Sequence, residues 1–87
     1  MKIIKLNRRF KQFKEHGHTV ALRFDGYGSE SQAMEKVCRE KLKSHGWLRD
    51  HNWYSYYGDR PSPDCIRPYW ITFRNESDLT LVLLSVG

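Results

Sequence analysis

The stretch from Ser29 to Gly46, SESQAMEKVCREKLKSHG, constrains the fold most, because it is the one segment with a clear helical pattern. Its apolar side chains recur at helical spacing and form one stripe, made of Ala33, Met34, Val37, Cys38 and Leu42. Ser29 and Gln32 predict a capping box at the start of the helix, and Gly46 predicts its end. The stripe needs a partner to cover it, so the sequence predicts that this helix packs on a sheet.

Five further segments predict strands, because they combine alternating or apolar side chains with flanking turn residues. These segments are residues 2–6, 18–25, 53–58, 68–74 and 79–86. The lysines of the first suit an edge strand. The last, LTLVLLSV, is apolar on both faces and suits a central strand, reached through a hairpin connection at residues 75–78.

Residues 7–17 predict a short helical turn that Asn7 caps and Gly17 ends, packed by Phe10 and Phe13. A continuous β-ribbon that starts at Lys2 is the alternative for this segment.

Together these elements predict an α+β fold. It comprises a mostly antiparallel sheet of four or five strands, covered on one face by one main helix (29–46), with a short N-terminal helical turn. The chain has 87 residues, which leave no room for a second core, so we expect a single domain over residues 1–87. One helix covers one face only. The second face is therefore expected to be a binding surface or a homodimer contact, with large side chains from Trp70, one aromatic pair of residues 53–58, Val82, Leu84 and Val86.

The positive charge of the chain is concentrated at its N-terminus. The net charge is +5; residues 1–15 hold six basic side chains and one acidic one, whereas the other 72 residues hold nine of each. The six are Lys2, Lys5, Arg8, Arg9, Lys11 and Lys14. A solvated basic face would explain a charge of this size. Its segregation favours contact with a polyanion, either nucleic acid or an acidic groove on another protein.

Twelve aromatic residues are present, and eight of them lie between Trp47 and Phe73. Rings beside basic residues on a sheet are typical of proteins that bind single-stranded nucleic acid, and also of protein–protein hot spots. Many of these rings are expected in the core, and the RGFGFVxF signature is absent. The residues expected at the partner surface are Lys5, Arg8, Arg9, Lys11, Lys14, Tyr54, Tyr56, Trp70 and Arg74. The Pro-punctuated loop at 59–67 is a further candidate.

Catalytic and metal-binding patterns are weak. The four histidines lack cysteine or glutamate partners at metal-ligand spacing, so no metal, cofactor or catalytic residue is expected. His45 and His51 remain a possible general acid–base pair for RNA cleavage. The predicted order of helix, Gly46 and three strands is similar to that of double-stranded-RNA-binding folds and small HicA-type RNA-cleaving toxins. Their Gly-Ser-His signature and closing helix are missing from the predicted pattern.

The longest apolar run, Leu81 to Leu84, is far too short for a membrane span, and no secretory signal follows the basic N-terminus. Two cysteines, Cys38 and Cys65, do not make a disulfide framework, so a reduced, cytoplasmic protein is expected.

These observations predict a small non-enzymatic binding protein, a regulator or inhibitor. It would dock on an acidic protein surface or a nucleoprotein complex through its basic N-terminal segment and an aromatic sheet face. Viral proteins of the phage antagonist class, such as anti-CRISPR proteins, combine this size with the lack of a pocket. Direct RNA or DNA binding through the same surface is the alternative, and a small RNA-cleaving toxin is the third.

Overall fold

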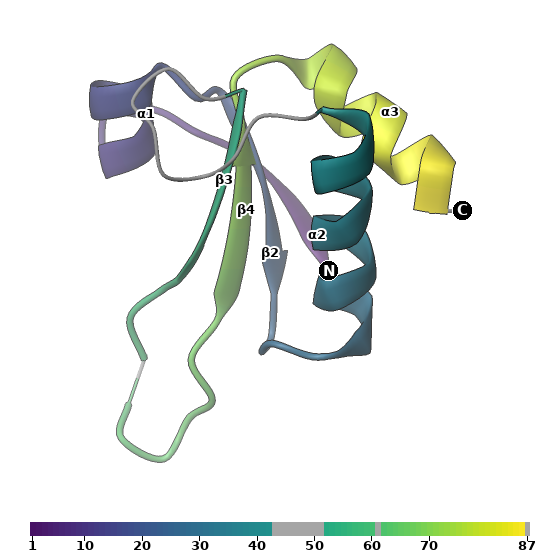
Figure 1. The fold of residues 1–87 in the computed structure, drawn as a ribbon. Coiled ribbons are helices and arrows are strands. Elements are labelled where there is room, and N and C mark those ends of the chain that lie inside the picture. Colours follow the sequence, from purple (N-terminus) through teal and green to yellow (C-terminus); the bar gives the residue numbers. More distant parts are fainter. Residues whose placement is uncertain (43–51, 61, 87) are drawn as a thin grey trace.

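The computed structural model describes residues 1–42, 52–60 and 62–86, and these residues form a four-stranded sheet with three helices (Figure 1). The elements are β1 (Lys2–Lys5), α1 (Lys11–His16), β2 (Val20–Phe24), α2 (Ser29–Lys41), β3 (Trp53–Tyr57), β4 (Tyr69–Phe73) and α3 (Glu76–Val86). All neighbouring strands pair antiparallel, in the order β1-β2-β4-β3. The predicted α+β fold is confirmed, and the lysine-bearing β1 does lie at an edge.

Helix α2 begins at Ser29 as predicted, but its cap differs from the one expected. The N-cap is Gly28, and the hydroxyl of Ser31 accepts the Gly28 N–H at 2.8 Å and donates to the Gly28 carbonyl at 3.0 Å. The predicted capping box of Ser29 and Gln32 is therefore wrong. The first helical hydrogen bond runs from the N–H of Gln32 to the carbonyl of Gly28, so the cap is Gly28 and not Ser29. The predicted end at Gly46 lies outside the described residues.

The C-terminal segment is a helix, which overturns the prediction of a strand at 79–86 with a hairpin connection at 75–78. The carbonyl of Asn75 accepts the N–H of Leu79 at 3.4 Å, which makes the supposed connection the first turn of α3. Leu79 and Val82 are buried, whereas Leu84 is 76% exposed. The apolar side chains that were expected on the two faces of a strand therefore lie on the buried and exposed sides of a helix.

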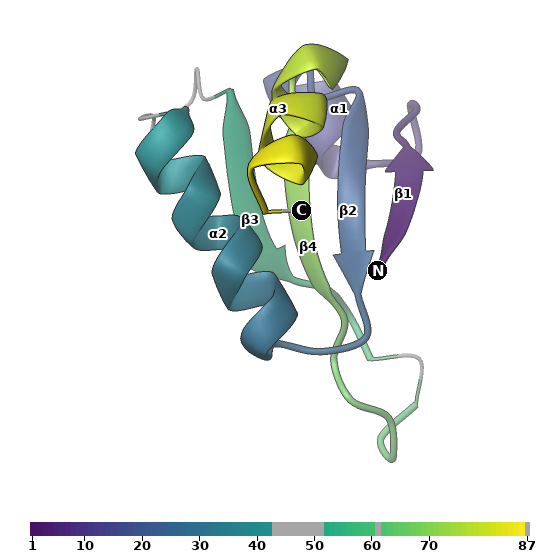
Figure 2. The same ribbon diagram turned by 90° about the vertical axis from the view of Figure 1, so that its right-hand side faces the viewer.

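Helix α3 lies beside α2 on the same face of the sheet, as Figure 2 shows. Two helices therefore cover this face, where one was expected. Among the described residues, α2 is followed by two strands and a helix. The three-strand order that resembled double-stranded-RNA-binding folds and HicA-type toxins is consequently not found there. The expectation that a closing helix is missing is wrong, because α3 closes this order.

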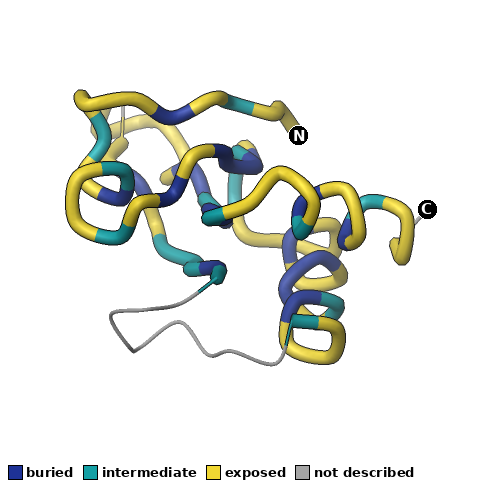
Figure 3. The backbone as a smooth tube through the Cα atoms, turned by 90° about the horizontal axis from the view of Figure 1, so that it is seen from above, coloured by how far each residue is buried: buried dark blue, intermediate teal, exposed yellow. Residues whose placement is uncertain are grey.

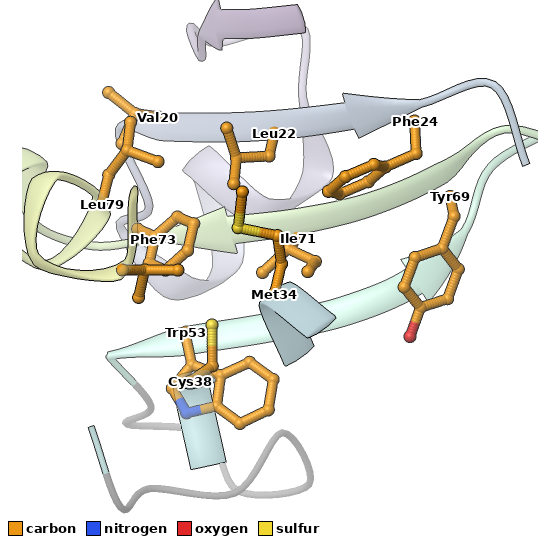
Figure 4. Packing of buried hydrophobic residues seen from close by; sticks show 11 residues of the cluster. Val20, Leu22, Phe24, Met34, Cys38, Trp53, Tyr69, Ile71, Phe73 and Leu79 are labelled. Atoms are coloured by element: carbon orange, nitrogen blue, oxygen red, sulfur yellow. The ribbon is translucent and has the colours of Figure 1, made fainter. Parts of the chain in front are cut away.

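The core lies between the sheet and these two helices. Alternate side chains of the two central strands and Trp53 of β3 point into it, and α2 contributes Met34 and Cys38 (Figure 4). The strand residues of this core cluster are Val20, Leu22, Phe24, Trp53, Tyr69, Ile71 and Phe73. The predicted alternation of β2, β3 and β4 is confirmed, because side chains of a strand point to opposite faces in turn.

The second face of the sheet is partly covered by α1. This helix ends at Gly17, whose φ of 68° is the left-handed conformation predicted for it, and the alternative of a β-ribbon is wrong. Asn7 caps the turn before α1 instead of α1 itself: its Oδ1 accepts the N–H of Arg9 at 2.9 Å. Figure 3 shows buried backbone running through the middle of the structure, with exposed residues along α1 and the outer side of α3. Val82, Leu84 and Val86 were expected on this second face, but they belong to α3, which covers the other face, so that expectation is wrong for these three.

Among the described helices, none combines the length and the apolar character needed to cross a lipid bilayer.

Candidate functional site

A row of rings crosses the second face of the sheet. The strand register places Tyr56 of β3 opposite Trp70 of β4, and Trp70 opposite Arg23 of β2. The rings of Tyr56 and Trp70 are nearly parallel, 7° apart in orientation and 6.3 Å between centroids, and the Arg23 guanidinium lies 6.0 Å from the Trp70 ring. Tyr54 continues the row, 5.8 Å from Tyr56.

Helix α1 lies along this row because both of its ends contact it. Phe10, the N-cap residue, lies 5.9 Å from Trp70, and His16, the last helical residue, stacks on Tyr54 at 5.9 Å and 17°. Next to this second contact, His18 is fully buried and its Nδ1 hydrogen-bonds Oγ1 of Thr72 at 2.7 Å. These contacts attach the most basic part of the chain to the aromatic face.

A groove of about 480 Å³ lies between the start of α1 and the outer strand β3. It is lined by Lys11, Gln12, Tyr54, Tyr56, Tyr57, Gly58 and Asp59. The ring of Tyr57 points to the other face of the sheet, where it contacts Tyr27 and Tyr69. The rings of Tyr54 and Tyr56, one cation, one carboxylate and one amide therefore line a single concave surface. Such a surface can stack a planar group and form hydrogen bonds with its edge.

Gln12 differs from the other lining residues because it is only 8% exposed. Its Oε1 is buried and has no hydrogen-bond partner among the described residues. Most buried polar atoms in folded proteins have a partner, because an unpaired one costs about 1–3 kcal/mol. Oε1 is thus a buried acceptor without a partner among the described residues, in a side chain that lines the groove.

Burial, and secondarily the neighbouring Tyr54, raise the pKa of Tyr56 to about 12. The Tyr56 side chain is consequently a neutral phenol at physiological pH, able to donate its O–H. Tyr56 therefore contributes a hydrogen-bonding hydroxyl to the groove and no negative charge.

The structure separates the other residues that were predicted to form the partner surface. Lys5 pairs with Val20 and so lies on the helix-covered side of β1, away from the rings. Arg8 and Arg9 are exposed in the turn before α1, and the exposed Lys14 is carried by α1. Arg74 lies at the far end of that helix, where its Nη2 donates to the His16 carbonyl at 3.4 Å.

Trp70 supports the site more than it lines the groove. Its ring is half-buried against Phe10 and Arg23, and its Nε1 would lie 2.5 Å from a Cβ added at Gly58. Gly58 is required here because only the smallest residue permits this close approach.

A second hollow of about 470 Å³ involves the loop that the sequence singled out. It is lined by Tyr27, Tyr57, Arg60, Asp64, Cys65, Ile66 and Arg67. The Arg67 guanidinium lies 5.7 Å from the Tyr57 ring, and its Nε donates to the Gly58 carbonyl at 3.1 Å. These contacts join the loop to the end of β3 next to the first groove.

The histidines considered for RNA cleavage, His45 and His51, lie outside the described residues. Within the described ranges, no group of three or more His, Cys, Asp or Glu side chains is arranged to hold a metal ion. No family model, curated protein or solved structure matches the chain.

Proposed function

We propose that the protein is a non-enzymatic binding protein, a regulator or inhibitor, that docks on an acidic protein surface or a nucleoprotein complex. The observation that supports this most is that Lys11 of the basic segment and the rings of Tyr54 and Tyr56 line one groove. Cations steer an acidic partner toward the site, and half-buried rings give contact area and specificity at little entropic cost.

The basic segment is available for such steering. Lys11 and Lys14 are exposed on α1, and neither forms an ion pair with another residue in the described ranges. These two lysines could therefore bind an acidic partner without first breaking an ion pair within the protein. Two free thiols, one buried at Cys38 and one exposed at Cys65, fit a reducing compartment such as the cytoplasm. The narrower class of phage antagonists stays a prediction from the sequence.

The test is a pull-down from the native host, followed by association kinetics with the captured macromolecule. The double change Lys11→Glu and Lys14→Glu should slow association about tenfold or more at low salt. A matched control is Lys36→Glu with Lys41→Glu, which makes the same change of net charge on α2, across the sheet (Figure 2). Equal slowing by both pairs would show that net charge alone acts, and it would refute this site.

The rings are tested separately through the dissociation rate. Tyr56→Ser should speed dissociation, because the ring that is lost lies in the groove, whereas Tyr27→Ser on the opposite face should not. Trp70→Ala is a poorer probe, since that ring also packs against Phe10. Unchanged dissociation of Tyr56→Ser would remove the groove from the interface.

A further inference from the structure

Resting on the proposed function, we infer that the groove between α1 and β3 binds an unpaired base of a single-stranded nucleic acid. Tyr54 and Tyr56 would stack on the base, Gln12 and Asp59 would hydrogen-bond its edge, and Lys11 would hold a neighbouring phosphate. The polyanion bound by the basic N-terminal segment would then be a single-stranded nucleic acid.

The size and walls of the groove fit a base. Its volume of about 480 Å³ is within the range of roughly 300–1,000 Å³ that is usual for ligand pockets. Two ring-bearing residues of β3 form one wall, and the first residues of α1 form the other. Every base has a π-face, so aromatic side chains of this kind bind single strands generally.

The amide of Gln12 is the element that points to hydrogen bonding with the base. It lines the groove, it is more than nine-tenths buried, and its Oε1 has no partner among the described residues. A glutamine amide offers both a donor and an acceptor, and rotation about its last bond exchanges the two. This pair is complementary to the N6 and N7 atoms of adenine.

Asp59 narrows the choice of base and disfavours an acidic peptide. An ionised carboxylate only accepts hydrogen bonds, so it favours bases with an exocyclic amino group, which are adenine, cytosine and guanine. Uracil and thymine have no amino group and offer only their N3–H to such an acceptor. A peptide carboxylate in the same groove would be repelled by Asp59 and attracted by Lys11 alone. A base, which is uncharged, avoids this repulsion while its phosphate lies toward Lys11.

The experiment is a fluorescence anisotropy titration of the full chain with labelled oligonucleotides of about 12 nucleotides. Oligo(A), oligo(C) and oligo(U) RNA test the base, and oligo(dA) and oligo(dT) DNA distinguish the two sources of single strand. We expect oligo(A) and oligo(C) to bind about five- to tenfold more tightly than oligo(U), and oligo(dA) more tightly than oligo(dT).

Three variants assign the roles. Gln12→Met keeps the side-chain volume and removes the amide, so it should weaken binding of oligo(A) more than that of oligo(C) without lowering thermal stability. Gln32→Met, exposed on α2, is the control. Asp59→Asn should raise binding of oligo(U), because the new amide can donate to O4. Lys11→Ala should reduce the slope of log K against log salt by about 0.7, while Lys36→Ala leaves it unchanged.

Equal affinity for oligo(A), oligo(C) and oligo(U), or a preference that survives both Gln12→Met and Asp59→Asn, would overturn the inference. So would the absence of oligonucleotide binding. If oligonucleotides do not bind but an acidic protein is captured through Lys11 and Lys14, the inference fails and the proposed function stands. If neither an oligonucleotide nor an acidic protein binds, the inference and the proposed function both fail.

Discussion

The hydroxyl of Tyr69 donates a 2.9 Å hydrogen bond to Oε2 of Glu35, and this bond ties strand β4 to helix α2. The second carboxylate oxygen, Oε1, accepts a 2.6 Å bond from the guanidinium of Arg39. Glu35 is only 7% exposed, so its charge depends on these two donors. A buried carboxylate without partners is strongly destabilising, which makes this small network a fixed point of the helix-covered face.

Removing the Tyr69 hydroxyl should destabilise the fold. We expect Tyr69→Phe to lower the free energy of unfolding by about 1.5–3 kcal/mol, because a hydrogen bond to a charged group is lost inside the protein. Tyr27→Phe is the control, since Tyr27 is 45% exposed and its change should stay within about 0.5 kcal/mol. Urea titrations measure both, and equal effects would contradict the importance of the Tyr69–Glu35 bond.

Alkaline pH should weaken the fold in two stages. Burial, reinforced by Glu35, raises the pKa of the Cys38 thiol from 9.0 to about 12, and burial likewise raises that of Tyr56 from 10.0 to about 12. Above pH 9 the unfolded chain releases protons that the native state retains. Stability is therefore complete below pH 9 and falls as pH rises, by about 1.4 kcal/mol per pH unit for each proton.

Urea titrations between pH 7 and pH 11 check this dependence. In Cys38→Ala the decline should begin near pH 10 instead of pH 9, because the raised pKa of Tyr56 then sets its onset. Cys65→Ala should leave the profile unchanged, since that thiol is exposed. A Cys38→Ala profile that still declines from pH 9 would show that another group is responsible.

A side chain at position 58 should displace Trp70. The Cβ of Gly58→Ala would lie 2.5 Å from Trp70 Nε1 and 3.1 Å from Cγ of Pro68, so we expect a loss of about 1–3 kcal/mol. At Gly28 an added Cβ meets nothing within 4 Å, and Gly28→Ala should cost less. Tryptophan fluorescence and urea titration report the two changes. The loss should shrink in a Trp70→Ala background, and a loss of full size there would place the clash elsewhere.

The end of α1 should be sensitive to its backbone conformation. Gly17 has a φ of 68°, and its Cβ would meet nothing within 4 Å, so Gly17→Ala isolates the backbone term. We expect it to cost about 1–2 kcal/mol and Gly17→Asn to cost less, since asparagine tolerates the left-handed conformation. Thermal unfolding measures the difference. Equal costs for the two changes would show that the conformation at residue 17 is not what limits this helix.

The sheet strands were predictable because their side chains alternate in a way that any reader of the sequence can see. Val20, Leu22 and Phe24 face the core while Ala21 and Arg23 face away, and this period of two survives in the structure.

Helix α3 was missed because a short apolar run does not distinguish a buried strand from a buried helix by periodicity alone. The missed signal lay before the run: Asn75 precedes the acidic Glu76 and Asp78, an arrangement that favours a helix start. Within the run, Leu79, Val82 and Leu83 follow helical spacing, and they are the ones that pack inward.

The groove could be predicted only in part. Lys11, Tyr54 and Tyr56 were identified from charge and aromaticity, and the structure brings these three together. Gln12 and Asp59 carry no sequence signal, because their role depends on α1 lying across the sheet. That docking follows from contacts between Phe10 and Trp70, which are distant in the sequence.

The pairing of β2 with β4 has a consequence for synthesis of the chain. These two central strands join residues 20–24 to residues 69–73, so the middle of the sheet cannot form until residue 73 has emerged from the ribosome. Until then Leu22, Phe24 and Met34 cannot be buried against β4, so they stay exposed to solvent. A nascent fragment that ends near residue 42 should therefore aggregate or recruit chaperones, even though it already contains the longest helix.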